Sequence, residues 1–154
     1  HRRVVARAPR AVHGYPGRVI DVYRQTWFRC APGRPAQFAI VTAWNPNGLR
    51  VGAAENARRD RLLLRALRHR HWPIDAGSRD GAWREASHGV QCSLAQAVAL
   101  GRRFRQVAVF WEAGDAVWIV ACATGARHLA APWSARWVPH ATPGRGPDTP
   151  PQPA

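Results

Sequence analysis

The chain has 154 residues, a hydrophobic fraction of 46% and a formal net charge of +14 at pH 7. Its length is that of one typical domain, and its hydrophobic fraction is sufficient for a core. No apolar run approaches the ~20 residues that a membrane helix needs, and arginines interrupt the N-terminal apolar stretch that a signal peptide would require. We therefore expect no membrane association and a cytoplasmic location.

The positive charge comes from arginine alone, because all 23 basic residues are arginine and none is lysine. Eight of them lie within residues 1–35. This bias, with abundant Ala, Gly and Pro and no Met, is typical of GC-rich coding. A basic arm still binds RNA or DNA weakly through counterion release. The charge thus favours weak nucleic-acid binding over a dedicated nucleic-acid domain.

The composition along the chain predicts three parts. Residues 1–17 form a disordered basic arm, residues 18–140 a single folded domain, and residues 141–154 a disordered tail rich in Pro and Gly. The domain begins with a short helix or turn over residues 19–23, followed by strands over 26–30 and 37–43.

The middle of the domain predicts a turn, a helix and an irregular connection. Asn45-Pro46-Asn47-Gly48 has turn chemistry, and a helix follows over residues 53–69. One helix face carries Asn56, Asp60, Leu63 and Leu67, whereas Arg58, Arg61, Arg65 and Arg68 lie on a solvated face. Residues 71–83 read as irregular.

The last third predicts a strand over residues 85–92 and then a helix to about residue 104, opened by a Ser93–Gln96 capping box. Strands over 107–112 and 116–122 flank Ala113-Gly114-Asp115, which is a hairpin signal. The order predicts an α+β two-layer domain, with a mixed β-sheet and two main helices packed on one face.

Four motifs carry a resemblance to a known family. They are Thr42-Ala43-Trp44-Asn45-Pro46, Glu55-Asn56, Glu85-Ala86-Ser87 and Phe104-Arg105-Gln106-Val107-Ala108-Val109-Phe110. With this spacing, the chain resembles an uncharacterised bacterial family of domains of unknown function over roughly residues 20–122, and Tyr23 and Thr26-Trp27 fit its opening pattern. The resemblance implies domain boundaries and a polar cluster, but no reaction.

The polar residues of these motifs form the candidate site. Each lies near the end of a predicted strand or helix, and such ends can converge at one edge of an α+β domain. Glu85 and Glu55 are the candidate catalytic residues, because a carboxylate among carboxamides acts as a general base when its pKa is raised. Carboxamides and hydroxyls suit recognition of a base, an amide or a sugar. The ligand-binding candidates are Thr42, Asn45, Asn56, Ser87 and Gln106.

A purely structural interpretation of the same residues stays open. Asn side chains build turns by bonding their own backbone, and Glu55 suits the first turn of a helix through the helix dipole. Glu85 has no comparable structural explanation in the sequence.

The remaining candidates are weaker. Cys30, Cys92 and Cys122 form no CxxC pair and predict buried free thiols. His69, His71, His88 and Cys92 lack the paired spacing of a zinc site, so we expect no metal and no cofactor. The eight tryptophans are interpreted as packing residues, with base stacking as the alternative.

The leading functional hypothesis is therefore binding, with hydrolysis as an extension, of a small polar or nucleotide-like ligand. The alternatives are a nucleic-acid-associated accessory protein that uses the Arg-rich arm, and an interaction module without a site of its own. The sequence leaves the oligomeric state open.

Overall fold

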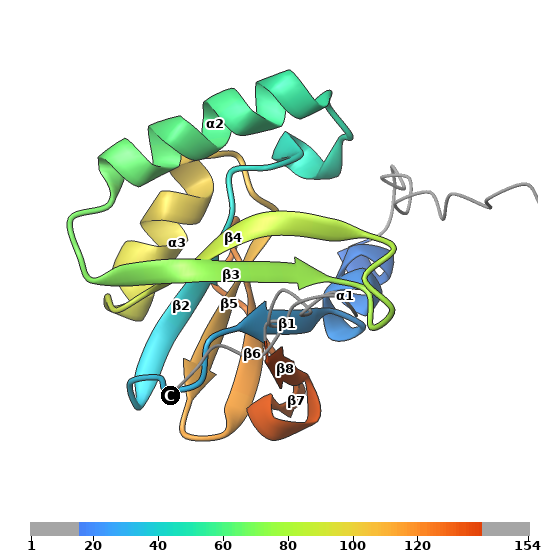
Figure 1. Cartoon of the computed structure of the whole chain (residues 1–154), viewed down its shortest axis with the longest axis vertical. Coiled ribbons are helices and arrows are strands. Elements are labelled where there is room, and N and C mark those ends of the chain that lie inside the picture. The colour runs from blue at the N-terminus through green and yellow to red at the C-terminus, as the bar shows by residue number, and fades with distance from the viewer. Residues whose placement is uncertain (1–15, 140–154) are drawn as a thin grey trace, which may run out of the picture.

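A computed structural model describes residues 16–139 of the chain. Within this range the chain forms helices α1 (Pro16–Arg24), α2 (Ala53–Ala66) and α3 (Leu94–Arg103), two short 3₁₀ helices, η1 (Pro46–Gly48) and η2 (Trp133–Ala135), and eight strands (Figure 1). The strands are β1 (Trp27–Cys30), β2 (Gln37–Val41), β3 (His71–Gly77), β4 (Arg84–Val90), β5 (Ala108–Ala113), β6 (Ala116–Ala121), β7 (Arg127–Pro132) and β8 (Trp137–Pro139).

All eight strands belong to one sheet, in the order β7-β6-β5-β2-β4-β3-β1-β8. Neighbouring strands pair antiparallel except β1 and β8, which pair parallel. The sheet is therefore mixed, and the expected α+β class is confirmed.

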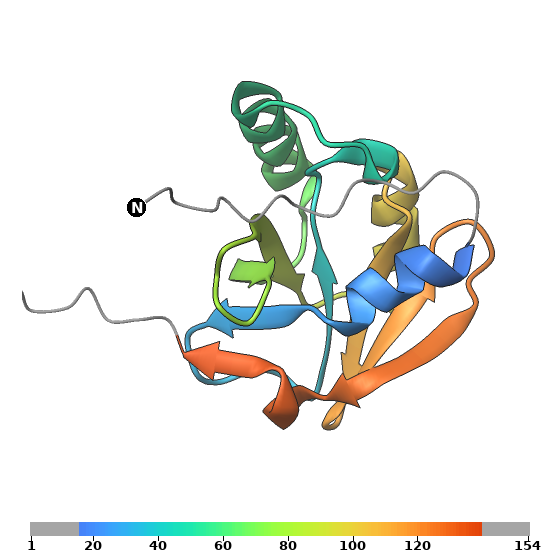
Figure 2. The same ribbon diagram turned by 90° about the vertical axis from the view of Figure 1, so that its right-hand side faces the viewer.

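The sheet is strongly curled. Three strands separate β1 from β5 in the sheet, yet the Phe28 ring on β1 contacts the Phe110 ring on β5 with centroids 4.9 Å apart. Trp133 in η2 stacks on Phe28 at 5.4 Å, and the chain passes from β7 through η2 directly into β8 (Figure 2). The two outer strands of the sheet are thus linked by the four residues 133–136, and the aromatic side chains fill a concave interior.

The convex face of the sheet carries the two main helices, as expected. Both helices pack on strand residues such as Val41 and Val109. The buried helix residues are Leu63 in α2, Leu67 at the C-terminal end of α2, and Ala97 in α3. Ser93 and Gln96 make both hydrogen bonds of the expected capping box, which defines the start of α3. Helix α1 lies on the other face, where Tyr23 contacts the Phe110 ring at 5.2 Å.

The expectation of an irregular connection over residues 71–83 is wrong for its first half, because residues 71–77 form β3. Pro73 has no backbone N–H to donate to a neighbouring strand, so a proline is unusual within a central strand. The register resolves this, since β1 pairs only with Asp75, Ala76 and Gly77. Within residues 16–139, Pro73 therefore lies where one side of β3 has no strand partner.

The last strands were not predicted. No strand was expected after Cys122, but β7 and β8 follow and complete both edges of the sheet. Strand β7 has no fully buried residue, and its Leu129 is 55% exposed. A strand without a buried alternating face gives little periodicity in the sequence. None of the helices in residues 16–139 has the length and hydropathy that a membrane crossing requires.

Candidate functional site

The turn after β2 is the centre of a polar network. Asn45 adopts a left-handed conformation with φ 48°, which asparagine tolerates better than most residues. Its Oδ1 accepts hydrogen bonds from the Val51 amide and from Asn56 Nδ2, each at 3.1 Å. The Asn45 amide in turn donates to Asn56 Oδ1 at 2.9 Å. These bonds fasten the 45–51 loop to the first turn of α2.

The same asparagine contacts Glu85. Asn45 Nδ2 donates to Glu85 Oε1 at 2.6 Å, across 40 residues of sequence. The structure therefore brings together three of the expected site residues, Asn45, Asn56 and Glu85, from a turn, a helix and a strand.

Thr42, Ser87 and Gln106 surround this network, but their hydrogen bonds go to the backbone. Thr42 Oγ1 donates to the Ala86 carbonyl at 2.7 Å, and Ser87 Oγ donates to the Glu85 carbonyl at 3.3 Å. Gln106 Nε2 donates to the Trp44 carbonyl at 3.0 Å. Thr42 thus links the end of β2 to β4, and Gln106 links the start of β5 to the turn after β2, whereas the Ser87 bond stays within β4.

Glu85 lies on the concave side of the sheet. It pairs with Ala76 of β3, whose side chain belongs to the concave core. Burial raises the pKa of the Glu85 carboxyl, and the Asn45 hydrogen bond opposes that rise. Nearby, burial and then the charge of Glu85 raise the pKa of the Tyr23 phenol. Glu85 is thus a carboxyl in a poorly solvated, partly aromatic environment.

The structure places Glu55 apart from this group. Its carboxylate faces solvent on α2 and accepts hydrogen bonds from Arg58 at 2.6 and 2.8 Å and from Arg59 at 3.0 Å. The hydrogen bond from Arg58, with the charges of Arg58 and Arg59, lowers the pKa of Glu55 to about 2. Glu55 therefore forms a surface ion cluster at the start of the helix.

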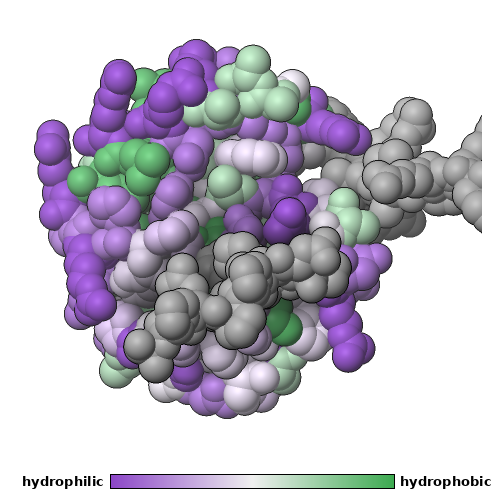
Figure 3. Space-filling model, in the orientation of Figure 1, coloured by the Kyte–Doolittle hydropathy of each residue, from purple (hydrophilic) through white to green (hydrophobic). Residues whose placement is uncertain are grey.

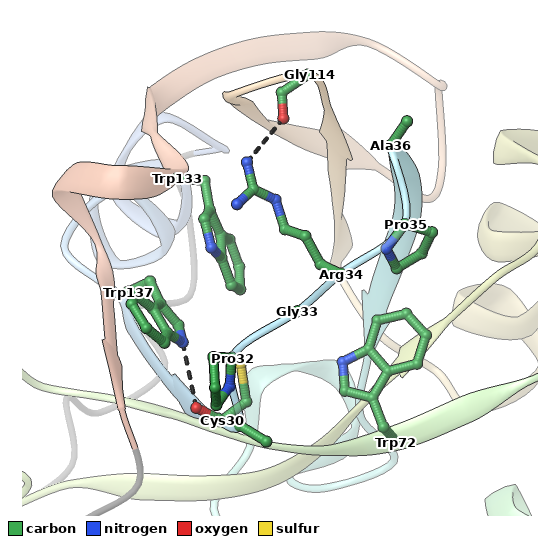
Figure 4. A pocket seen from close by; sticks show the side chains of 11 residues that line it. Cys30, Pro32, Gly33, Arg34, Pro35, Ala36, Trp72, Gly114, Trp133 and Trp137 are labelled. Carbon is green, nitrogen blue, oxygen red and sulfur yellow. Dashed lines mark hydrogen bonds between the residues drawn. The ribbon is translucent and has the colours of Figure 1, made fainter.

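A pocket at the far end of the concave interior was missed by the sequence reasoning. Its volume is about 440 Å³, and Trp72, Trp133, Trp137 and the 30–36 loop line it (Figure 4). Arg34 reaches from that loop across the pocket, with its guanidinium carbon 5.4 Å from the Trp133 ring centroid.

Glu112 is the buried partner of this arginine. Arg34 Nε lies 3.2 Å from Glu112 Oε1, and the Glu112 side chain has no exposed surface. Within the described residues, Glu112 Oε2 has no hydrogen-bond partner. Burial raises the pKa of Glu112 to about 7, although the charge of Arg34 opposes the rise. One signal was available, because Glu112 alternates in β5 with Ala108 and Phe110 and so shares their inward face.

The histidines and cysteines are dispersed. His88 Nε2 contacts Asp60 Oδ1 at 2.6 Å, tying β4 to α2. Across residues 16–139, no three His, Cys, Asp or Glu side chains gather in an arrangement that could hold a metal ion. Cys30 and Cys122 are buried free thiols, and Cys92 is half-buried. The expected basic arm over residues 1–17 lies outside the described residues except for its last two.

Comparison with known proteins gives one match. The model of a family described as "Protein of unknown function (DUF3293)" matches residues 41–109. The matched span includes every residue of the expected site, and it agrees with the expected resemblance to a domain family of unknown function. No curated protein and no solved structure matches the chain.

Proposed function

We propose that this domain binds a small polar ligand beside the Asn45–Asn56–Glu85 network, with Glu85 as the group that contacts it. The supporting observation is the state of Glu85, a largely buried carboxyl on the concave face with a raised pKa. One of its oxygens is held by Asn45. Among the described residues, no hydrogen bond reaches the other oxygen, which leaves it for a ligand.

The chemistry of Glu85 favours a nucleotide-like ligand or another compound with amide or amino groups. A carboxyl with a raised pKa stays protonated to a higher pH than an ordinary glutamate, and in the protonated form it can both donate and accept a hydrogen bond. The same property is what a general acid or base needs if the bound ligand is hydrolysed. The satisfied carboxamides position Glu85 and have little capacity left for a ligand.

The test is a thermal-shift screen of the full chain against nucleosides, nucleotides and amino-acid amides. A compound that raises Tm in the wild type should fail to do so in Glu85→Gln. The apo Tm should change little, because glutamine has the shape of a protonated glutamate and its Oε1 can still accept from Asn45.

Glu55→Gln is the matched control, since it makes the same chemical change at an exposed carboxylate outside the network. It should retain every ligand-induced shift. A shift that survives in Glu85→Gln, or is lost equally in both variants, would show that Glu85 is not the contact.

A further inference from the structure

A groove between α2 and the end of α3 is lined mainly by arginines. Its volume is about 520 Å³. Figure 3 shows hydrophilic side chains projecting along α2 at the top of the molecule. Leu62, Ala66 and Phe104 supply the apolar part of the lining. We call it the arginine groove, after the six arginines that line it: Arg58, Arg59, Arg65, Arg68, Arg103 and Arg105.

Most of this charge is not balanced within the described part of the chain. Glu55 neutralises part of the charge of Arg58 and Arg59. Arg65, Arg68, Arg103 and Arg105 form no ion pair with any acidic residue among residues 16–139. The C-terminal dipoles of α2 and α3 favour cations at Arg65 and Arg103, but they do not balance four like charges that share one groove.

Arg105 adds a second, independent observation. It has φ 55°, a left-handed conformation. Arg105 comes directly after Phe104, the C-cap residue of α3. The backbone amide of the following residue, Gln106, donates a hydrogen bond to the Gly101 carbonyl at 2.8 Å. Glycine usually occupies this position of a helix end, because a β-carbon is strained there. The chain thus keeps an arginine at a strained position from which its side chain lines the groove.

We propose that the arginine groove binds the phosphate backbone of a nucleic acid. Guanidinium groups match phosphate oxygens with paired hydrogen bonds, and several unbalanced arginines in one groove gain most from a partner with repeating phosphates. The chain's net charge of +14 attracts such a partner over longer distances. Phosphate contacts carry no base information, so binding is independent of sequence. This surface is separate from Glu85, and neither proposal depends on the other.

The experiment measures fluorescence anisotropy of a labelled 20-nucleotide oligothymidine and of a 20-base-pair duplex with the full chain, from 50 to 200 mM NaCl. The groove variant is Arg65→Gln/Arg68→Gln/Arg103→Gln/Arg105→Gln. The control variant is Arg24→Gln/Arg79→Gln/Arg84→Gln/Arg127→Gln, which removes the same charge from exposed residues on α1, the β3–β4 loop, β4 and β7.

In the wild type, log Kd should rise linearly with log[NaCl] for at least one of the two probes. Each lost phosphate contact lowers this slope by about 0.9 for duplex and about 0.7 for single strands. The slope of log Kd against log[NaCl] should therefore be lower by about 3 in the groove variant, and by less than about 1 in the control variant. The probe bound more tightly shows whether the groove takes single or double strands.

Three results would overturn the proposal. Equal losses in both variants mean that only net charge matters, and an unchanged slope in the groove variant means that binding occurs elsewhere. Tighter binding of polyglutamate than of either nucleic acid at the same salt concentration means that the partner is an acidic protein.

Arg105→Gly separates binding from folding. It should raise Tm by about 3 °C, because glycine relieves the left-handed strain, and it should lower the salt slope by about one contact. If the variant is more stable and binds nucleic acid as tightly as the wild type, Arg105 does not contribute to binding.

Discussion

At the scale of single residues, the carboxamides of the network are structural supports with defined partners. Asn45 joins the 45–51 loop, α2 and β4 through both ends of its side chain. The sequence motifs indicated which polar residues would gather. They did not indicate that Asn45 uses its hydrogen-bonding groups within the chain, because that depends on a left-handed backbone and on partners up to 40 residues away.

Asn45→Ala tests this role. The variant removes the bonds to Glu85, Val51 and Asn56 and leaves buried polar groups unpaired, so the free energy of unfolding should fall by about 2–3 kcal/mol. Urea denaturation followed by circular dichroism measures this change.

Asn47→Gly is the matched control, because Asn47 also has a positive φ, of 57°, in the same loop, but is exposed. It should change stability by less than about 0.5 kcal/mol. Similar effects of the two substitutions would mean that loop conformation matters and the network does not.

At the scale of elements, the contact of α3 with the sheet depends on one glycine. A Cβ added at Gly101 would meet Cys122 Sγ at 2.5 Å and Val109 Cγ1 at 2.8 Å. The helix therefore approaches β5 and the end of β6 more closely than any other residue would permit.

Gly101→Ala should accordingly destabilise the domain by about 1–3 kcal/mol through overpacking, although alanine is the better helix former.

Gly52→Ser should have the opposite effect on the stability of the domain. Gly52 is the N-cap of α2 and lacks a side-chain hydrogen bond, so serine there should be neutral or stabilising by a few tenths of a kcal/mol. Thermal melts of both variants measure the pair, and a stabilised Gly101→Ala would contradict the close packing.

Local signals predicted the elements well where they were strong. The Ser93–Gln96 capping box and the Gly114 hairpin predicted the start of α3 and the β5–β6 turn, because the determining contacts lie within a few residues. Strand β3 was not predicted. It tolerates Pro73 because β1 pairs only with residues 75–77, and that register depends on contacts between residues far apart in the sequence. Arg34 and Glu112 are 78 residues apart, so the sequence could indicate the inward face of Glu112 but not its partner.

At the scale of the whole molecule, the curled sheet encloses carboxyls with raised pKa values near both ends of its interior, Glu85 and Glu112. A carboxyl whose pKa is higher in the folded state keeps its proton while the unfolded chain loses one. The free energy of unfolding therefore decreases as pH rises from the ordinary value of 4.5 to about 7 for Glu112. The pKa of Glu55 is lowered to about 2, so its titration affects the free energy of unfolding only below pH 4.5.

Glu112→Gln should remove that part of the pH dependence. The variant should match the wild type near pH 4.5 and exceed it by about 3 kcal/mol above pH 7.5, where the wild type carries a buried charge. Urea unfolding at four pH values between 4.5 and 8 measures the difference. Parallel curves for the two proteins would show that Glu112 titrates normally.

The parallel pairing of β1 with β8 has a consequence for how the protein is made. Phe28, Arg29 and Cys30 lie opposite Trp137, Val138 and Pro139, so the first strand of the described residues pairs with the last. Until the ribosome has released residue 139, β1 has an open edge and the aromatic interior lacks Trp133 and Trp137. The β1–β8 pairing therefore forms only after more than a hundred further residues have followed β1, and until then the unpaired edge of β1 is open to pairing with another strand.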